Sequence, residues 1–214
     1  MMGKVSIPKY TLGEELVNAI SHGVGAGLAI AALVLLIIRA TSTIGVVTGV
    51  IYASIMIILY IKSCIYHALS PKLTGKKVFR VLDHCNVLLM VAGTYTPICL
   101  SLLGGTLGWI VFGIVWGVTV LAIVFNCIDI DKYKKLCIAL NLLLGWAALI
   151  IIKPLIEACP VNGLILLIAG GVVYSIGGIL YGLGKKKKYM HSVFHFFVIG
   201  ASVLHFFMIY LYVV

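Results

Sequence analysis

Residues 18–38 read NAISHGVGAGLAIAALVLLII, a run that holds no Asp, Glu, Lys or Arg. An α-helix rises about 1.5 Å per residue, so a run of this length can cross a hydrocarbon layer about 30 Å thick. Six further apolar runs of similar length follow along the chain, at residues 44–66, 81–103, 107–128, 136–152, 161–183 and 190–213. The sequence therefore predicts seven transmembrane helices.

The composition agrees with a membrane domain. Of the 214 residues, 63% are hydrophobic and 10% are charged, whereas soluble domains are about half apolar and a quarter charged. The runs lack the alternating polarity of a transmembrane strand, so we expect an all-α fold rather than a barrel. We expect one seven-helix domain over residues 1–214, with a short cytoplasmic N-terminal segment, residues 1–14. The first run is too long for a signal peptide core and should stay in the mature protein.

The net charge of +10 is better explained by membrane topology than by nucleic-acid binding. In a seven-helix arrangement, Arg39 and Lys153 flank one side of the membrane and the other basic residues flank the opposite side. Loops rich in Lys and Arg face the cytoplasm, so we expect a cytoplasmic N-terminus, an external C-terminus and a multi-pass protein of the plasma membrane. The basic side carries Lys4, Lys9, Lys72, Lys76, Lys77, Arg80, Lys132, Lys134, Lys135 and a topogenic anchor, Lys185 to Lys188.

Glycines recur four residues apart inside several runs, a spacing typical of helices whose backbones approach closely in lipid. We therefore expect close helix contacts at Gly23 and Gly27, Gly113 and Gly117, and Gly178 and Gly182.

Ionisable side chains gather at the basic side of the predicted bundle. His67 ends the second run, with Ser63 one turn deeper on the same helix face. Asp83 lies at the start of the third run. His191 and His195 are four residues apart, so they share one face where the seventh run begins. Three helix ends distant in sequence thus bring imidazoles and a carboxylate to one membrane depth.

Imidazole nitrogens are typical zinc ligands, and three protein ligands with one open position are typical of a catalytic site. We predict that His67, His191 and His195 bind Zn²⁺ directly. Asp83 would be either a fourth ligand or the general base that holds a metal-bound water, and Ser63 would hydrogen-bond nearby. Taken singly, an HxxxH pair at a helix end is more typical of interfacial or buried histidines. The convergence of these residues at one depth favours the metal.

The first run carries a polar face of its own. Glu15, Asn18 and His22 follow at i, i+3 and i+7, so they align on one side of the helix near the same membrane surface. One interpretation is that they orient the metal ligands, because metal-bound histidines usually donate their other nitrogen to an oxygen acceptor. The other is a polar clasp between helices.

Five motifs lie in order along the chain: E-x-x-N-x-x-S-H from Glu15, S-x-x-Y-H from Ser63, D-H at Asp83, A-G-T-Y-T-P from Ala92, and histidines at 191, 195 and 205. Together these motifs resemble the progestin and adipoQ receptor family, specifically its bacterial hemolysin-III-like branch. The similarity covers essentially the whole chain. The resemblance implies a seven-helix fold with zinc held by His67, His191 and His195, and with Asp83 reaching the ion through water. Family members resemble alkaline ceramidases in site layout, which implies hydrolysis of a lipid amide.

Two functional hypotheses remain open. In the first, the protein is a zinc-dependent hydrolase whose partner is a membrane lipid or fatty-acyl substrate with an amide or ester bond. In the second, it is a sensor or regulator of membrane homeostasis in which zinc is structural and nothing is turned over. A third, a pore-forming haemolysin, is disfavoured because the runs hold few polar residues to line a water-filled path.

Overall fold

The computed structural model describes residues 5–183 and 187–214, so Lys4, Lys185 and Lys186 of the orientation argument lie outside the described residues. Within this part of the chain every regular element is helical, which confirms the all-α class. The helices are α1 (Leu12–Arg39), α2 (Thr43–Ala68), α3 (Thr74–Pro97), a π-helical segment (Ile98–Leu103), α4 (Gly105–Ile128), α5 (Ile130–Trp146), a short 3₁₀ turn (Ala147–Leu149), α6 (Ile152–Ala158), α7 (Val161–Leu183) and α8 (Met190–Tyr212).

The helices suit a membrane. Six of them are long and apolar enough to span one, and α5 with α6 makes a seventh span if the bent pair counts as one. Many outward side chains are large and apolar, such as Ile38 and Ile179. Such a surface fits lipid rather than water.

The fifth span is not the continuous helix that we predicted for residues 136–152. The helix begins earlier, at Ile130, and the pair α5 and α6 is bent by 54° before ending at Ala158. Pro154 accounts for the break, because its ring has no N–H to donate and clashes with the carbonyl four residues earlier, at Ile150.

The third span also begins earlier than predicted. Helix α3 starts at Thr74, so Lys76 and Arg80 lie inside the helix, although both precede the predicted run 81–103. Both side chains are buried, and each has a carboxylate partner. Since their charges are compensated within the protein, the helix can continue through them.

Two of the predicted glycine contacts are wrong. No atom lies within 4 Å of the place that a side chain would take at Gly113, Gly117, Gly178 or Gly182. Close approach occurs instead at Gly25, where such a side chain would meet the ring of Tyr60.

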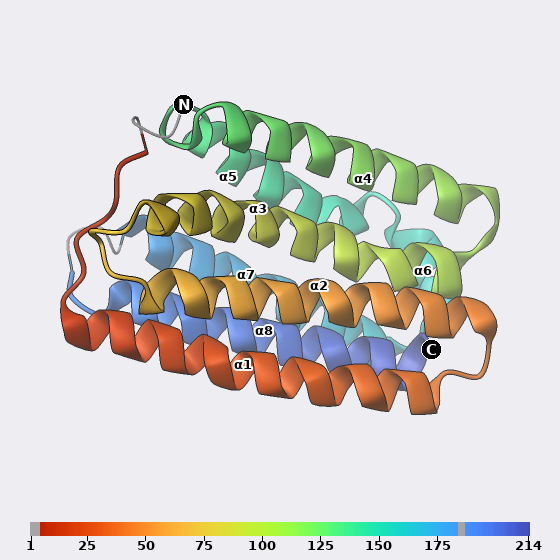
Figure 1. Ribbon diagram of the computed structural model, residues 1–214. Helices are drawn as coiled ribbons and strands as arrows, with labels where there is room; N and C mark the ends of the chain where they lie inside the picture. Colours follow the sequence, from red (N-terminus) through yellow and green to blue (C-terminus); the bar gives the residue numbers. More distant parts are fainter. Residues whose placement is uncertain (1–4, 184–186) are drawn as a thin grey trace.

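Successive helices pack as neighbours around the bundle, and α8 packs against both α1 and α7 (Figure 1). Helix α1 begins at one end of the bundle and α8 ends at the other (Figure 1), as an odd number of spans requires. We call the end where α1, α3, α5 and α8 begin the basic end, because it carries Lys9, Lys72, Lys76, Lys77, Arg80 and Lys132. Four helices thus begin at the basic end, and three others, α2, α4 and α7, end there.

Candidate metal centre

The histidines of the candidate centre come from two helices at the basic end. His67 lies one residue before the end of α2, and His191 is the second residue of α8. His195 follows one turn later on the same face of α8. Both His67 and His195 are buried. The end of one helix and the start of another therefore place three imidazoles together, although His67 and His191 are 124 positions apart in the sequence.

The three imidazoles are close enough to share one ion. One nitrogen from each of His67, His191 and His195 lies within 4.8 Å of the other two. The Nε2 atoms of His191 and His195 are 3.2 Å apart. A tetrahedral zinc ion with Zn–N distances of about 2.0–2.1 Å holds its ligand nitrogens about 3.3 Å apart. The donor set and its spacing therefore fit a metal ion.

The hydrogen bonds of His67 leave one nitrogen available for the ion. Its Nδ1 atom lies 2.6 Å from Oε2 of Glu15 and 3.4 Å from Nδ2 of Asn18. Its Nε2 atom is buried and has no hydrogen-bond partner. A ring whose Nδ1–H donates to a carboxylate presents the lone pair of Nε2, which is the form that binds metals.

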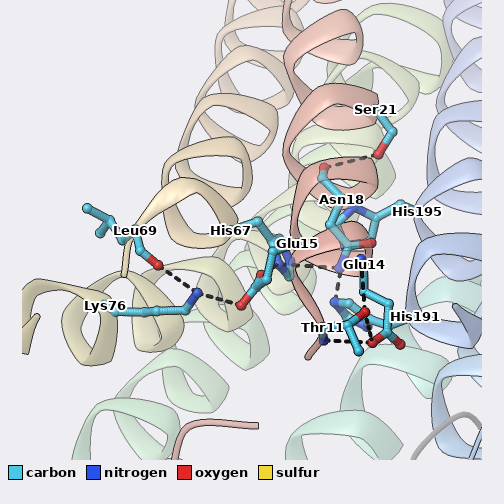
Figure 2. A network of polar contacts seen from close by, with 10 residues as sticks. All are labelled: Thr11, Glu14, Glu15, Asn18, Ser21, His67, Leu69, Lys76, His191 and His195. Carbon is cyan, nitrogen blue, oxygen red and sulfur yellow. Dashed lines mark hydrogen bonds and ion pairs between the residues drawn. The ribbon is translucent and has the colours of Figure 1, made fainter. Parts of the chain in front are cut away.

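Glu15 is itself held by a buried lysine (Figure 2). Its Oε1 atom accepts a bond of 2.6 Å from Nζ of Lys76, which also donates to the carbonyl of Leu69 at 2.8 Å. Lys76 is fully buried. The carboxylate thus links an ammonium on α3 to an imidazole on α2, and its orientation is constrained from both sides.

The two other predicted support residues lie deeper along α1. Asn18 is fully buried and contacts His67 as described above. The ring of His22 stacks on His195, with ring centroids 3.7 Å apart and an interplanar angle of 15°. These positions agree with either interpretation of the polar face of α1, because the same residues touch the histidines and join three helices.

Asp83 and Ser63 lie beside the histidines rather than among them. The group of nitrogens that could hold an ion consists of the three histidines, and Asp83 is not part of it. Asp83, Ser63, His191 and His195 all line a cavity of about 210 Å³ between the helices. Both roles predicted for Asp83, a fourth ligand or a group that holds a metal-bound water, require it to lie beside the histidines, and the shared cavity has room for a bridging water.

The cavity extends from the basic end into the apolar interior. Its wall is mostly hydrophobic and is built by α2, α3, α5, α7 and α8. Leu164 and Leu167 of α7 line it away from the basic end, as does His205 of α8. An engineered apolar cavity of about 150 Å³ holds a benzene molecule, so this space can hold part of an apolar ligand.

The chain ahead of α1 lies across the histidines, and we call residues 5–11 the N-terminal strap. The ring of Tyr10 stacks on His191 at a centroid distance of 5.1 Å and lies 5.9 Å from His67. Ser6 binds Oδ2 of Asp131 through its amide and its hydroxyl, at 3.1 and 3.0 Å. Burial raises the pKa of Tyr10, so its hydroxyl stays protonated. The strap therefore lies against His191 and His67 through the ring of Tyr10.

Neither Lys76 nor Tyr10 was among our predicted site residues. Lys76 looked like one more topogenic charge, although a carboxylate such as Glu15 on a helix near the membrane surface needs a cationic partner and could have pointed to one. Tyr10 lies in a short segment without periodicity, and its contact with His191 joins the two ends of the chain. No pattern in the sequence signals that contact.

Comparisons with known proteins agree with the motifs. Residues 10–206, which include all three histidines, match the family described as haemolysin-III related. The chain is 39% identical to Hemolysin-3 of Bacillus cereus over 204 residues, which cover 94% of this chain and 92% of that protein. It is 38% identical to the Hemolysin-3 homolog of Bacillus subtilis over 208 residues, with 96% and 97% covered. The human Monocyte to macrophage differentiation factor is 23% identical over 177 residues, which cover 78% and 70%.

Proposed function

The chain belongs to the haemolysin-III-related family, and from this premise we propose that it is a zinc-dependent hydrolase of an amide or ester bond in a membrane lipid. Membership makes it a multi-pass protein of the plasma membrane. One observation carries the proposal: three imidazoles converge on one point, and two of them, His191 and His195, line an apolar cavity. We further propose that the basic end is cytoplasmic, because basic loops stay on that side.

Each residue of the site would have its own role in the proposed reaction. His67, His191 and His195 hold the ion, and Glu15 fixes the ring of His67. Zinc, when bound, supplies a Lewis acid that polarises a carbonyl group and makes water more acidic. Asp83 would accept a proton from the attacking water at its carboxylate and return it to the leaving nitrogen or oxygen as the acyl bond breaks, while Ser63 would hydrogen-bond nearby.

The cavity and the strap complete the proposed site. The cavity holds the acyl chain, so that the bond to be cleaved lies beside the histidines. The strap, with Tyr10 over His191, keeps cytoplasmic water away from the reacting groups. Exclusion of bulk water strengthens every electrostatic contact in such a site.

The test uses the protein purified in detergent, with bound metal quantified. Defined ceramides and lysolipids are incubated with the wild type and with Asp83→Asn, and products are measured by mass spectrometry. We expect equal zinc in both proteins and product from the wild type alone. Asp129→Asn is a matched control, because Asp129 caps α5 at backbone amides and Asn caps as well. Equal product from Asp83→Asn would contradict the proposed role of Asp83.

A second candidate function is a non-catalytic regulator of membrane homeostasis. One observation favours it: the ligands would come from the end of α2 and the start of α8, so an ion would cross-link two helices. Metal binding coupled to helix packing can report on the state of the membrane without turnover. Stoichiometric zinc with no product from any lipid would support this function and overturn the hydrolase.

A pore-forming activity, which the names of the bacterial relatives suggest, has the least support. Water-filled paths are lined by polar or charged side chains. The wall of the cavity is mostly hydrophobic among the described residues.

A further inference from the structure

The wall of the cavity carries a cationic side chain near the histidines. Lys134 lies in the second turn of α5 and lines the cavity together with Asp83 and His191. Its Nζ atom donates to the hydroxyl of Tyr181 at 2.7 Å and lies 4.7 Å from the centre of that ring. The ring of Tyr181 is in turn 5.6 Å from the ring of His191. The ammonium therefore lies one aromatic ring away from the candidate metal centre.

This placement distinguishes Lys134 from the other cations of the basic end. Lys76 is linked to His67 through Glu15 and Arg80 is paired with Asp131, but neither lines the cavity. Among the described residues that line the cavity, which also include several histidines, Asp83 is the carboxylate and Lys134 the ammonium. Lys134 is thus the cation that a ligand in the cavity would meet. An ammonium next to an apolar space favours an anionic group, because charge-assisted hydrogen bonds are about twice as strong as neutral ones.

We propose that Lys134 binds the anionic headgroup, of the phosphate type, of a lipid whose acyl chain occupies the cavity. The inference rests on the proposed function, which places the acyl carbonyl beside His191 and His195. A lipid in that position extends its headgroup from the carbonyl toward the wall formed by α5 and the end of α7, where Tyr181 holds the ammonium. Lys134 is then a specificity-determining residue that favours anionic lipids over neutral ones.

The anion of a headgroup and the carboxylate of a free fatty acid are expected to bind at different places in the cavity. A fatty acid in the same cavity would place its carboxylate where the acyl carbonyl of the lipid lies, at the histidines. Its binding should therefore depend little on Lys134. A phosphate joined to the acyl chain through glycerol lies several bonds further on, beside the ammonium.

The test compares lipids that differ only in the headgroup and cannot be hydrolysed. The probes are 1-tetradecylglycerol 3-phosphate and 1-tetradecylglycerol, both ether-linked, with myristate as the carboxylate. Their dissociation constants are measured on the full chain in neutral detergent at fixed salt. Because no bond is cleaved, the result is independent of whether the protein is a hydrolase.

The proteins compared are the wild type, Lys134→Gln, Lys134→Met, Lys134→Arg and Lys135→Gln. Lys135 is the matched control, because it lies on the same helix but is exposed and does not line the cavity. Thermal melting identifies the variants that fold. If Lys134→Gln does not fold, Lys134→Met is used in its place. Lys134→Arg keeps the positive charge.

We expect the wild type to bind the phosphate lipid about tenfold or more tightly than the neutral one, as one charge-assisted hydrogen bond allows. Lys134→Gln should bring this ratio close to one, whereas Lys134→Arg and Lys135→Gln should keep most of it. A ratio near one in the wild type would overturn the proposal. An equal loss of this ratio in Lys135→Gln would also overturn it, because it would indicate an effect of general surface charge. An equal loss of myristate binding in Lys134→Gln would overturn it too, because it would place a fatty-acid carboxylate at Lys134.

Discussion

Oε2 of Glu15 lies 2.6 Å from Nδ1 of His67. This contact joins the first turn of α1 to the last turn of α2. It leaves Nε2 of His67 without a hydrogen-bond partner, so that this atom can serve as a ligand together with the other two histidines. Because the opposite oxygen of Glu15 is held by Lys76, the carboxylate cannot turn away without breaking a second bond. The orientation of one candidate ligand is therefore set by two residues that would not themselves touch the ion.

Replacing Glu15 should weaken metal binding without removing a ligand. In Glu15→Gln the acceptor loses its charge, so the ring of His67 is less firmly oriented, and loss of such a partner typically lowers metal affinity about 10- to 100-fold. The zinc dissociation constant is measured by competition with a chromophoric chelator. Glu157→Gln, at an exposed position near the opposite end, controls for the loss of one negative charge. An unchanged affinity in Glu15→Gln would refute the orienting role.

Removing Lys76 should destabilise the fold itself. Lys76→Met leaves the carboxylate of Glu15, whose side chain is 12% exposed, without its ammonium partner. Breaking a buried ion pair on one side typically costs about 3–5 kcal/mol. The free energy of unfolding is measured in mixed micelles with increasing SDS. The double variant Lys76→Met with Glu15→Gln should recover part of the loss, and a double variant no more stable than Lys76→Met would argue against a direct pair.

Loss of a histidine ligand should lower metal content and stability together. We expect His67→Ala or His191→Ala to purify with little zinc and a lower melting temperature, because a ligand at about 100 times its dissociation constant stabilises by about 2.7 kcal/mol. Metal is measured by mass spectrometry and melting by intrinsic fluorescence. His205→Ala is the control: His205 is buried and bonds to the carbonyl of Leu167, so its loss should lower stability but leave zinc in place. Metal loss with unchanged melting would indicate a peripheral ion.

The strap should control how fast metal leaves the site. Tyr10→Ala removes the ring that stacks on His191, so we expect faster release of zinc to an excess of chelator in stopped-flow measurements. Tyr10→Phe keeps the ring and should release zinc at the wild-type rate. Ser6→Ala removes one of the two bonds to Asp131 and should have a smaller effect in the same direction. Equal rates in Tyr10→Ala and the wild type would show that the metal leaves by another route.

Much of the fold could be predicted because lipid imposes simple rules on the chain. A run such as residues 18–38 must form a helix if it crosses the bilayer, since its backbone polar groups have no other partner there. The errors lie where side chains change those rules locally. Pro154 breaks the fifth span, and the buried pairs of Lys76 and Arg80 extend the third span through charges that hydropathy alone treats as a loop.

The candidate site was predictable where depth alone decides proximity. His67, His191 and His195 share a membrane level, which is the condition for their approach, and the structure shows that α2 and α8 bring them together. Tyr10 and Lys134 could not be found in this way, because depth does not tell which helices are neighbours around the bundle. The contact of Lys134 with Tyr181 depends on α5 lying beside α7, which is a property of the assembled bundle.

The strap also dictates when the site can form during synthesis. Residues 5–11 are synthesised before the residues that they contact, because Asp131 follows four helices later and His191 follows only after α7. Tyr10 therefore lacks its partner until α8 is made. A nascent chain arrested before residue 190 would hold His67 without His191 and His195, so the three-histidine group can form only once α8 is in place.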